Sequence, residues 1–394
     1  MRIVELIARY VRIPLKKKIE HASHVRREND TLVVSCRLDD GSIGWGEGLP
    51  RPYVTGETIE TALGQFSETD WRSQLADDFD SLADVVSLCE RMKLAGSPAG
   101  EQRDCFGHSV RCAVELSILD AVGRATETPL SKVTTLVPES MPIRESRDEV
   151  RYSGVITAMG GIKKTIRAAA MRLYGFPDIK LKVGMDGAND PAAVALMRRV
   201  FGPDRDLRID ANEAWTCENL EDKLRPLLPH GISSVEQPVP HAAVDGLAAI
   251  RPRLDVPIML DESLCGLDDG HRAIERGTCD LFNLRLSKCG GYINSIKLAA
   301  LAHNAGLGYQ LGCQVGETGI LSAAGRHFAT SVGGIRWVEG SYDRHLVKER
   351  LTIEDLTFKS GGRAPALTEA GLGVNIDHAA VERVTLREEH RPIG

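Results

Sequence analysis

The sequence lacks long hydrophobic runs. No uninterrupted apolar stretch approaches the roughly 18 residues that a membrane span needs, so no membrane partner is expected. The first residues, MRIVELIARY, carry Glu5 within an apolar stretch and have no small-residue cleavage site. They are predicted to form a strand and not a signal peptide, and we expect a cytoplasmic protein.

Paired cysteines and basic runs are also missing. The nine cysteines form no CxxC pair, and their odd number favours reduced thiols over a disulfide framework. The net charge is −6, the pI is about 6.0, and no basic run is longer than residues 16–18, which argues against a nucleic-acid surface. The composition, 42% hydrophobic and 26% charged, is typical of a soluble protein, and 394 residues predict two domains.

The first part of the chain predicts an α+β domain. Residues 2–13, 30–40 and 42–48 alternate polar and apolar side chains, which is typical of a three-stranded antiparallel meander. Residues 15–29 are polar and irregular and predict a mobile loop, and residues 48–58 predict a second loop. Apolar positions at helical spacing predict helices over 57–67, 80–95 and 108–124.

A strand–helix repeat follows. Apolar strands alternating with helical stretches predict a parallel sheet with both faces covered. Eight strands are predicted, over residues 153–158, 178–183, 206–211, 232–237, 257–262, 281–286, 308–313 and 335–340. The final segment, 351–394, contains DLTFKS and GLGVNID, which are predicted to be edge strands returning to the first domain.

Charged residues stand at the C-terminal ends of five successive strands. They are Lys182, Asp210, Glu236, Asp261 and Lys288, separated by 28, 26, 25 and 27 residues. Each step is about one strand, loop and helix, which is the period of a (β/α)8 barrel. In a barrel all five side chains would converge at one mouth. Three hard oxygen ligands favour Mg²⁺, and no HxH or HExxH pattern offers ligands to a softer metal.

The two lysines fit the role of bases. An ammonium group near a divalent cation or a second lysine has a lowered pKa, so the neutral amine can accept a proton. Lys180 lies two residues before Lys182, on the same face of the strand, and is expected to lower its pKa. The alternative for a strand lysine is a surface position. The alternative for each carboxylate is a helix N-cap, which explains three successive units poorly.

These motifs resemble those of the enolase superfamily, in particular its muconate-lactonizing subgroup. The similarity covers nearly the whole chain. In the barrel, the subgroup's KxK motif is matched by residues 180–182, DxN by 210–212, EQP by 236–238, DE by 261–262, and the lysine before glycines by 288–291. In the capping domain, its GxGE motif is matched by residues 44–47.

The resemblance implies an α/β fold, a modified (β/α)7β TIM-like barrel over residues 131–350 with an α+β capping domain over 1–130, to which 351–394 return. It implies Mg²⁺, with Mn²⁺ as a substitute, on Asp210, Glu236 and Asp261. It also implies a small-molecule carboxylate whose α-proton is handled by Lys182 and Lys288 while the metal stabilises the enolate. We expect a homo-oligomer.

Substrate specificity in the superfamily comes from two capping-domain loops, which map here onto residues 15–30 and 48–56. The candidate substrate contacts in these loops are His21, Arg51 and Tyr53, with plain solvent exposure as the alternative. Asn212 of the DxN motif and Glu317 after the seventh strand complete the set. The alternative for Glu317 is support of the following helix N-terminus.

The expected reaction is an isomerisation, either epimerisation or racemisation by 1,1-proton transfer, or cycloisomerisation. The string RPYVTGET resembles dipeptide epimerases, but in place of their Asp-x-Asp after the eighth strand this chain has Glu339, Gly340, Ser341 and Tyr342, with Asp343 further on. Acid-sugar dehydratases use a histidine on the seventh strand, where this chain has Gln310 and Gln314. A syn β-elimination resembling o-succinylbenzoate synthase stays open, and an inactive binding barrel is the alternative of another class.

Overall fold

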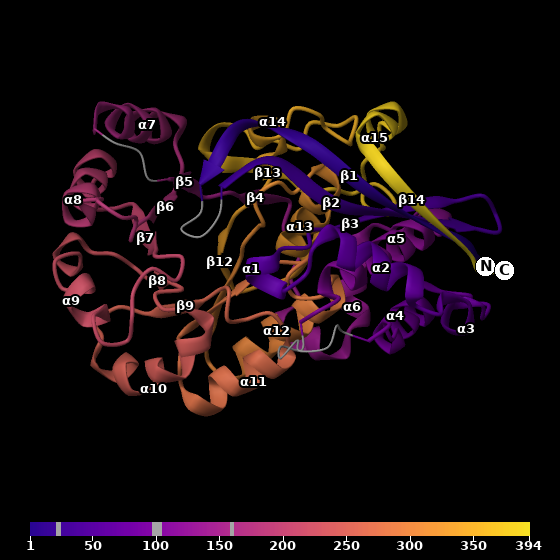
Figure 1. Cartoon of the computed structure of the whole chain (residues 1–394), viewed down its shortest axis with the longest axis horizontal. Coiled ribbons are helices and arrows are strands. Elements are labelled where there is room, and N and C mark those ends of the chain that lie inside the picture. Colours follow the sequence, from indigo (N-terminus) through magenta and orange to yellow (C-terminus); the bar gives the residue numbers. More distant parts are fainter. Residues whose placement is uncertain (21–24, 97–104, 158–160) are drawn as a thin grey trace.

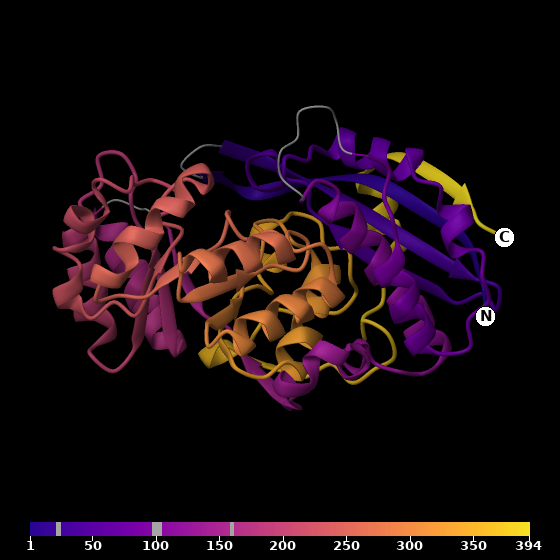
Figure 2. The same ribbon diagram turned by 90° about the horizontal axis from the view of Figure 1, so that it is seen from below.

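The computed structural model describes residues 1–20, 25–96, 105–157 and 161–394, and two sheets dominate it (Figure 1). The first sheet is antiparallel, in the order β14-β1-β2-β3. Its strands are β1 (Ile3–Glu20), β2 (Val25–Leu38), β3 (Ile43–Gly48) and β14 (Thr385–Pro392). Figure 2 shows the yellow strand β14 beside the indigo N-terminal strands. The two ends of the chain therefore share one sheet.

The second sheet has eight parallel strands in sequence order within the described residues. They are β5 (Gly154–Ile156), β6 (Asp178–Lys182), β7 (Asp206–Asp210), β8 (Val235–Glu236), β9 (Ile258–Leu260), β10 (Leu281–Leu284), β11 (Gly308–Leu311) and β12 (Ile335–Val338). The backbone N–H of Ser153 donates to the carbonyl of Val338 at 2.8 Å, which brings the two outer strands together. All eight predicted strands are confirmed, each somewhat shorter than predicted.

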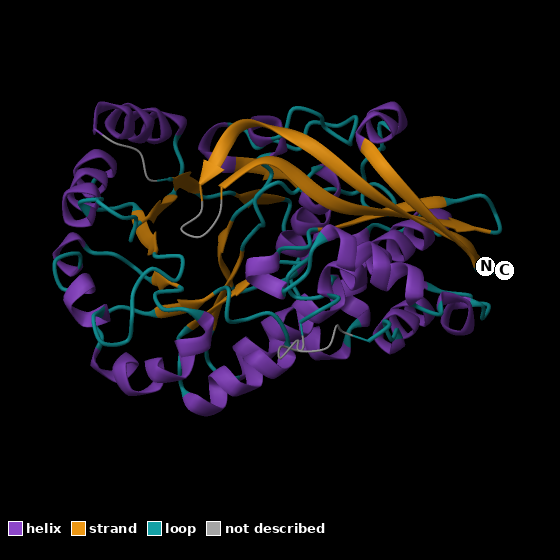
Figure 3. Ribbon diagram, in the orientation of Figure 1, coloured by secondary structure: helices purple, strands orange, loops and turns teal. Residues whose placement is uncertain are grey.

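Helices cover the outside of this sheet (Figure 3). Those that follow β5 to β11 are α7 (Gly161–Tyr174), α8 (Asp190–Phe201), α9 (Leu220–Leu224), α10 (Leu247–Ile250), α11 (Leu267–Arg276), α12 (Tyr292–Asn304) and α13 (Gly319–Ser331). The expected (β/α)7β barrel with a separate antiparallel cap is confirmed. The domain boundaries at residues 130 and 350 stay predictions.

The cap contains the three predicted helices and two short ones. They are α1 (Pro52–Thr55), α2 (Ile59–Glu68), α3 (Trp71–Leu75), α4 (Leu82–Arg91) and α5 (His108–Ala125). Smaller elements are α6 (Val133–Leu136), α14 (Asp343–Leu346), α15 (His378–Val384), the strand pair β4 (Glu149–Arg151) and β13 (Arg363–Pro365), and the 3-10 helices Leu130–Lys132, Pro138–Ile143, Leu228–His230, His241–Gly246, Arg251–Arg253 and Ser360–Gly362. None of the described helices has the length and apolarity needed to cross a bilayer.

The predicted irregular loop over residues 15–29 is wrong for most of its length. β1 continues to Glu20 and β2 begins at Val25, so the two strands extend as a hairpin ribbon. Its pairing shifts register between Pro14 and Ile19. A ladder needs only backbone groups, so polar residues can extend it where no core selects an apolar face. Residues 21–24 lie outside the described residues.

The predicted returning strands are also wrong. Residues 355–360 and 371–377 form no named strand, and the segment that returns to the first sheet is β14, TLREEHRP, which pairs with β1. Most β14 side chains are exposed or half-buried. A charged edge strand lacks the apolar alternation from which strands are predicted, because it has little core to face.

Helix α5 lies directly on β3 because both present small residues at the contact. A Cβ atom on Gly44, Gly46 or Gly48 would lie 2.0 Å from a backbone atom of α5. The three glycines alternate along β3 and so share one face. Their nearest partners on α5 are Ala121, Ala113 and Ser109. The Gly44–Gly48 pattern is therefore a helix-packing surface.

We predict that Gly46→Ala destabilises the protein by at least about 2 kcal/mol, because the new methyl group would overlap the Ala113 carbonyl. Gly64→Ala on α2 is the matched control, since its Cβ would meet nothing within 4 Å and a helical alanine gains up to about 1 kcal/mol. Urea unfolding measures both. Equal stability of the two variants would contradict this packing.

Candidate active site

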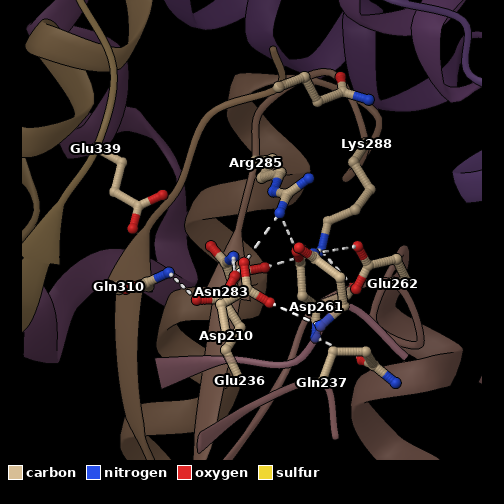
Figure 4. A network of polar contacts seen from close by, with 12 residues as sticks. Asp210, Glu236, Gln237, Asp261, Glu262, Asn283, Arg285, Lys288, Gln310 and Glu339 are labelled. Atoms are coloured by element: carbon tan, nitrogen blue, oxygen red, sulfur yellow. Dashed lines mark hydrogen bonds and ion pairs between the residues drawn. The ribbon is translucent and has the colours of Figure 1, made fainter. Parts of the chain in front are cut away.

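Three carboxylates meet at the C-terminal ends of neighbouring strands. Asp210 ends β7 and lies opposite Glu236 of β8 in the ladder, and Asp261 directly follows β9. All three are at most 1% exposed. Figure 4 shows them turned toward one another, with Arg285 and Lys288 above them. The predicted convergence of these strand ends is present in the structure.

Amide side chains hold this cluster in place. Asn283 Nδ2 donates to Glu236 Oε1 at 2.8 Å, and Gln237 Oε1 accepts from the backbone N–H of Asp261 at 2.8 Å (Figure 4). Gln237 belongs to the Glu-Gln-Pro string and has a positive φ of 33°. The glutamine thus turns back from its strand to orient the next carboxylate.

Each carboxylate is paired with cations of the protein. Lys180 Nζ lies 3.1 Å from Glu236 Oε2 and 3.6 Å from Asp210 Oδ2. Arg285 contacts Asp261 and lies 3.7 Å from Glu236 Oε1. Burial raises the pKa of Glu236, and Asp210 raises it further, because two buried anions repel each other.

The carboxylate set fits a hard divalent cation by its chemistry. Asp210 Oδ2 is buried and has no hydrogen-bond partner, although it lies within 4.0 Å of two ammonium groups. Among the described residues, no three acidic, histidine or cysteine side chains already enclose a position for an ion. Arg285 and Lys180 lie against the same oxygens that an ion would use. Side chains at the mouth would therefore rearrange when an ion binds.

The two candidate base lysines stand in different surroundings. Lys182 Nζ is 2.7 Å from Asn212 Oδ1, and its side chain is 20% exposed. Lys288 is fully buried, with Nζ 3.0 Å from Asp261 Oδ1 and 2.9 Å from the Asn283 carbonyl. Burial lowers the pKa of Lys288 despite the contact with Asp261.

Lys180 is held as a cation. Burial disfavours its charge, but Glu236, Glu339 and Asp210 together raise the pKa of Lys180. Its Nζ lies 2.8 Å from Glu339 Oε2. Lys180 is thus a buried positive charge beneath Lys182, as its spacing along β6 predicts.

Glu339 joins two buried cations at the end of β12. Its second oxygen accepts from Arg208 Nη2 at 2.6 Å, and Arg208 Nη1 donates to Asp178 Oδ1 at 2.8 Å. Although burial opposes ionisation, Lys180 and Arg208 lower the pKa of Glu339. Sequence reasoning missed Arg208, Arg285 and Asn283 and gave Glu339 no role. Arg208 lies two residues before Asp210, so the spacing that identified Lys180 could have found it.

Three of the predicted specificity residues, Arg51, Tyr53 and Glu317, lie within electrostatic range as the pairs Arg51–Tyr53 and Arg51–Glu317. Arg51 is 3% exposed, and its Nη2 donates to Asn29 Oδ1 at 2.7 Å and to the Val315 carbonyl at 3.2 Å. Glu317 Oε1 accepts from the Gln314 N–H, and burial raises the pKa of Glu317 to about 8.

Tyr53 and His21 are the other two contacts predicted in the cap loops. Tyr53 on α1 packs against a small cluster of Val54, Cys105 and Cys265. His21 lies outside the described residues. Support of the α13 N-terminus, the alternative role for Glu317, falls instead to Glu47, which accepts from the Thr318 and Leu321 N–H groups at 3.1 Å.

The chain matches one protein family and is similar in sequence to several characterised proteins. The Enolase C-terminal domain-like family matches residues 159–380. The chain is 26% identical to a hydrophobic dipeptide epimerase of Enterococcus faecalis, over 84% of this chain and 88% of that protein. It is 25% identical to an N-succinyl-L-Arg/Lys racemase of Bacillus cereus, over 99% of both.

Solved structures share the fold along the whole chain. The crystal structure of N-succinyl Arg/Lys racemase from Bacillus cereus has a TM-score of 0.86 and 24% identity, covering 99% of this chain and 100% of that one. A dipeptide epimerase from Cytophaga hutchinsonii, complexed with Mg and D-Ala-L-Val, has a TM-score of 0.83 and 24% identity at the same coverage.

We predict that Glu339→Gln lowers the free energy of unfolding by about 3–5 kcal/mol, because the buried cations Lys180 and Arg208 each lose one carboxylate partner. Glu149→Gln is the control. Glu149 makes an ion pair with Arg363 on the surface, where such pairs contribute about 0–1 kcal/mol. Denaturant unfolding compares the two, and a similar small effect in both would argue against the buried network.

Proposed function

The chain belongs to the enolase superfamily and is an enzyme of the isomerase type, and on this premise we propose that it catalyses a Mg²⁺-dependent 1,1-proton transfer at the α-carbon of a carboxylate. The supporting observation is the placement of Lys182 and Lys288 around one carboxylate cluster. Asp210 lies 4.0 Å from Lys182 Nζ, and Asp261 lies 3.0 Å from Lys288 Nζ. β10 is the fourth strand after β6 in a barrel of eight described strands, so the two amines belong to opposite sides of the barrel.

We assign the metal to Asp210, Glu236 and Asp261. They supply the hard oxygen atoms that Mg²⁺ prefers, and Asp210 Oδ2 has no hydrogen-bond partner. When bound, a divalent cation neutralises the substrate carboxylate and the charge that develops as the α-proton leaves. Asn283 and Gln237 hold Glu236 and Asp261 in position for this role.

The two lysines move the proton. The neutral amine of one lysine takes the α-proton on its face of the substrate and becomes an ammonium group. The ammonium group of the other lysine delivers a proton to the opposite face of the same carbon, so configuration inverts and no atom is lost. Burial of Lys288 favours its neutral form. Asn212, with a positive φ of 44°, accepts a hydrogen bond from Lys182 and orients it.

We further propose a substrate whose nitrogen is acylated. A free ammonium group would need an available carboxylate near the eighth strand, but Glu339 is engaged by Lys180 and Arg208, and Asp343 at the start of α14 is fully buried. Arg26 of the cap is half-buried and reaches the Val315 carbonyl in the loop after β11, and this cation favours a distal anionic group on the substrate. An N-succinyl amino acid has both features, and one relative is an N-succinyl-L-Arg/Lys racemase.

The first test concerns the metal. We predict that Glu236→Gln weakens Mg²⁺ binding by at least about tenfold, because it removes an anionic ligand, while the fold is retained. Isothermal calorimetry on purified protein measures the affinity, and Glu369→Gln, an exposed carboxylate, is the control. An unchanged Mg²⁺ affinity together with a lower melting temperature would mean that Glu236 is only structural.

The second test concerns the lysines. We predict that Lys182→Ala and Lys288→Ala each lower the rate of α-proton exchange in D2O by at least about 100-fold for one substrate enantiomer. Exchange of the other enantiomer should continue in each variant. Both variants should lose net racemisation. The compound used is the one that the wild-type protein exchanges fastest in a panel of N-succinyl amino acids and dipeptides. We expect this compound to be an N-succinyl amino acid. Lys359→Ala, an exposed lysine, is the control.

The outcome of this test separates the reaction classes. Full turnover in either lysine variant would refute the two-lysine reaction. A product that has lost its leaving group, with exchange from one face only in the wild type, would instead support a β-elimination. Faster exchange of dipeptides than of N-succinyl compounds would overturn the substrate class and leave the proton transfer intact.

A further inference from the structure

Helix α5 of the cap touches the chain segment that carries Lys288. We propose that His108 and Glu115 on α5 are positioning residues for Lys288, so that the cap controls proton transfer on one face of the substrate only. This inference rests on the two-lysine reaction proposed above. It adds that only one of the two lysines, Lys288, depends on the cap for its position. Residues 287–293 are called the Lys288 segment below.

The first contact holds the peptide carbonyl of Lys288 itself. His108 Nδ1 lies 2.8 Å from that carbonyl oxygen, and because a carbonyl only accepts, Nδ1 carries the hydrogen. The His108 ring also fills the space beside Gly290, where a Cβ would lie 3.1 Å from the ring. The ring therefore fixes both the position and the path of the chain at Lys288.

The second contact caps helix α12, which begins four residues after Lys288. Gly291 at its N-cap has no side chain to accept from the first N–H groups. Glu115 Oε1 accepts from Tyr292 N at 2.6 Å and from Ile293 N at 3.1 Å. Glu115 thus supplies from the cap what an N-cap side chain normally supplies.

The two glycines after Lys288 follow from this approach. Gly291 has a φ of 115°, and a Cβ there would lie 2.5 Å from Glu115 Oε1. Gly290 has a φ of 78° and faces the His108 ring. Both positions combine a left-handed backbone with close contact to α5, so glycine is required at each.

A third contact comes from the end of β3. The backbone N–H of Leu49 donates to Ser287 Oγ at 2.8 Å. β3 and α5 are themselves locked together by the glycine face of β3, as described above. The Lys288 segment is therefore held at three points by one rigid strand–helix pair of the cap.

Lys182 is held differently. In the described part of the chain its hydrogen bond and ion pair go to Asn212 and Asp210, which both belong to the barrel. A shift of α5 would move the Lys288 segment and leave β6 where it is. A displacement of about 1 Å at a reacting group can reduce a rate about 100-fold. The two faces of the substrate should respond unequally.

The test measures α-proton exchange of each enantiomer in D2O with the full-length, Mg²⁺-loaded protein. The Lys288→Ala variant defines which enantiomer Lys288 serves. We expect His108→Ala to slow exchange of that enantiomer by about 10- to 100-fold and of the other by less than about threefold. His108→Asn, whose amide can donate near the Nδ1 position, should restore part of the rate. His303→Ala on the exposed side of α12 is the control.

Further variants keep the inference testable if His108→Ala does not fold. His108→Phe retains the ring but removes the donor, and should show the same one-sided loss. Glu115→Gln keeps the accepting oxygen and should behave nearly as wild type, whereas Glu115→Ala should show the one-sided loss.

Equal slowing of both enantiomers in the His108 and Glu115 variants would overturn the positioning role, because a merely structural contact affects both faces. An absence of exchange with either enantiomer in the wild-type protein, across the substrate panel, would instead refute the proposed function.

Discussion

Charge pairing inside the barrel constrains the rest of the structure. Its interior holds the carboxylates and cations Asp178, Asp210, Glu236, Asp261, Glu339, Lys180, Arg208, Arg285 and Lys288. An unpaired buried charge costs several kcal/mol, so no member can be removed or displaced without disturbing its neighbours. Glu339 joins Lys180 and Arg208 deep in the barrel, whereas Lys180 and Arg285 also lie against the carboxylate oxygens that a bound ion would use.

Strand β3 connects this charged interior to the cap through its two faces. Gly44, Gly46 and Gly48 face α5 and allow backbone contact, whereas Glu47 faces the other way and accepts from the N-terminus of α13. Helix α5 in turn supplies Glu115 to the N-terminus of α12. The barrel helices α12 and α13 are thus capped at their N-termini by carboxylates of the cap. A shift of the cap would therefore displace residues at the mouth of the barrel.

The sequence predicted the barrel well because its signals are local. Apolar strands ending in Lys182, Asp210 and Glu236 identify both the element and the direction of its last side chain. Prediction failed where exposure removes the pattern: β14 is a charged edge strand, and the ribbon that extends β1 is polar. It also failed for contacts between distant segments, such as Glu339 with Arg208, because no spacing along the chain reveals which buried charges meet.

The central claim is that two lysines serve opposite faces of one carbon. The most direct measurement starts from one protiated enantiomer in D2O and follows deuterium at the α-carbon of both enantiomers during the first turnovers. The account predicts that the newly formed enantiomer carries deuterium from the start, because its proton comes from a second lysine that exchanges with solvent. A product enantiomer that keeps the original hydrogen would contradict the account, since one base would then have carried the same proton between faces.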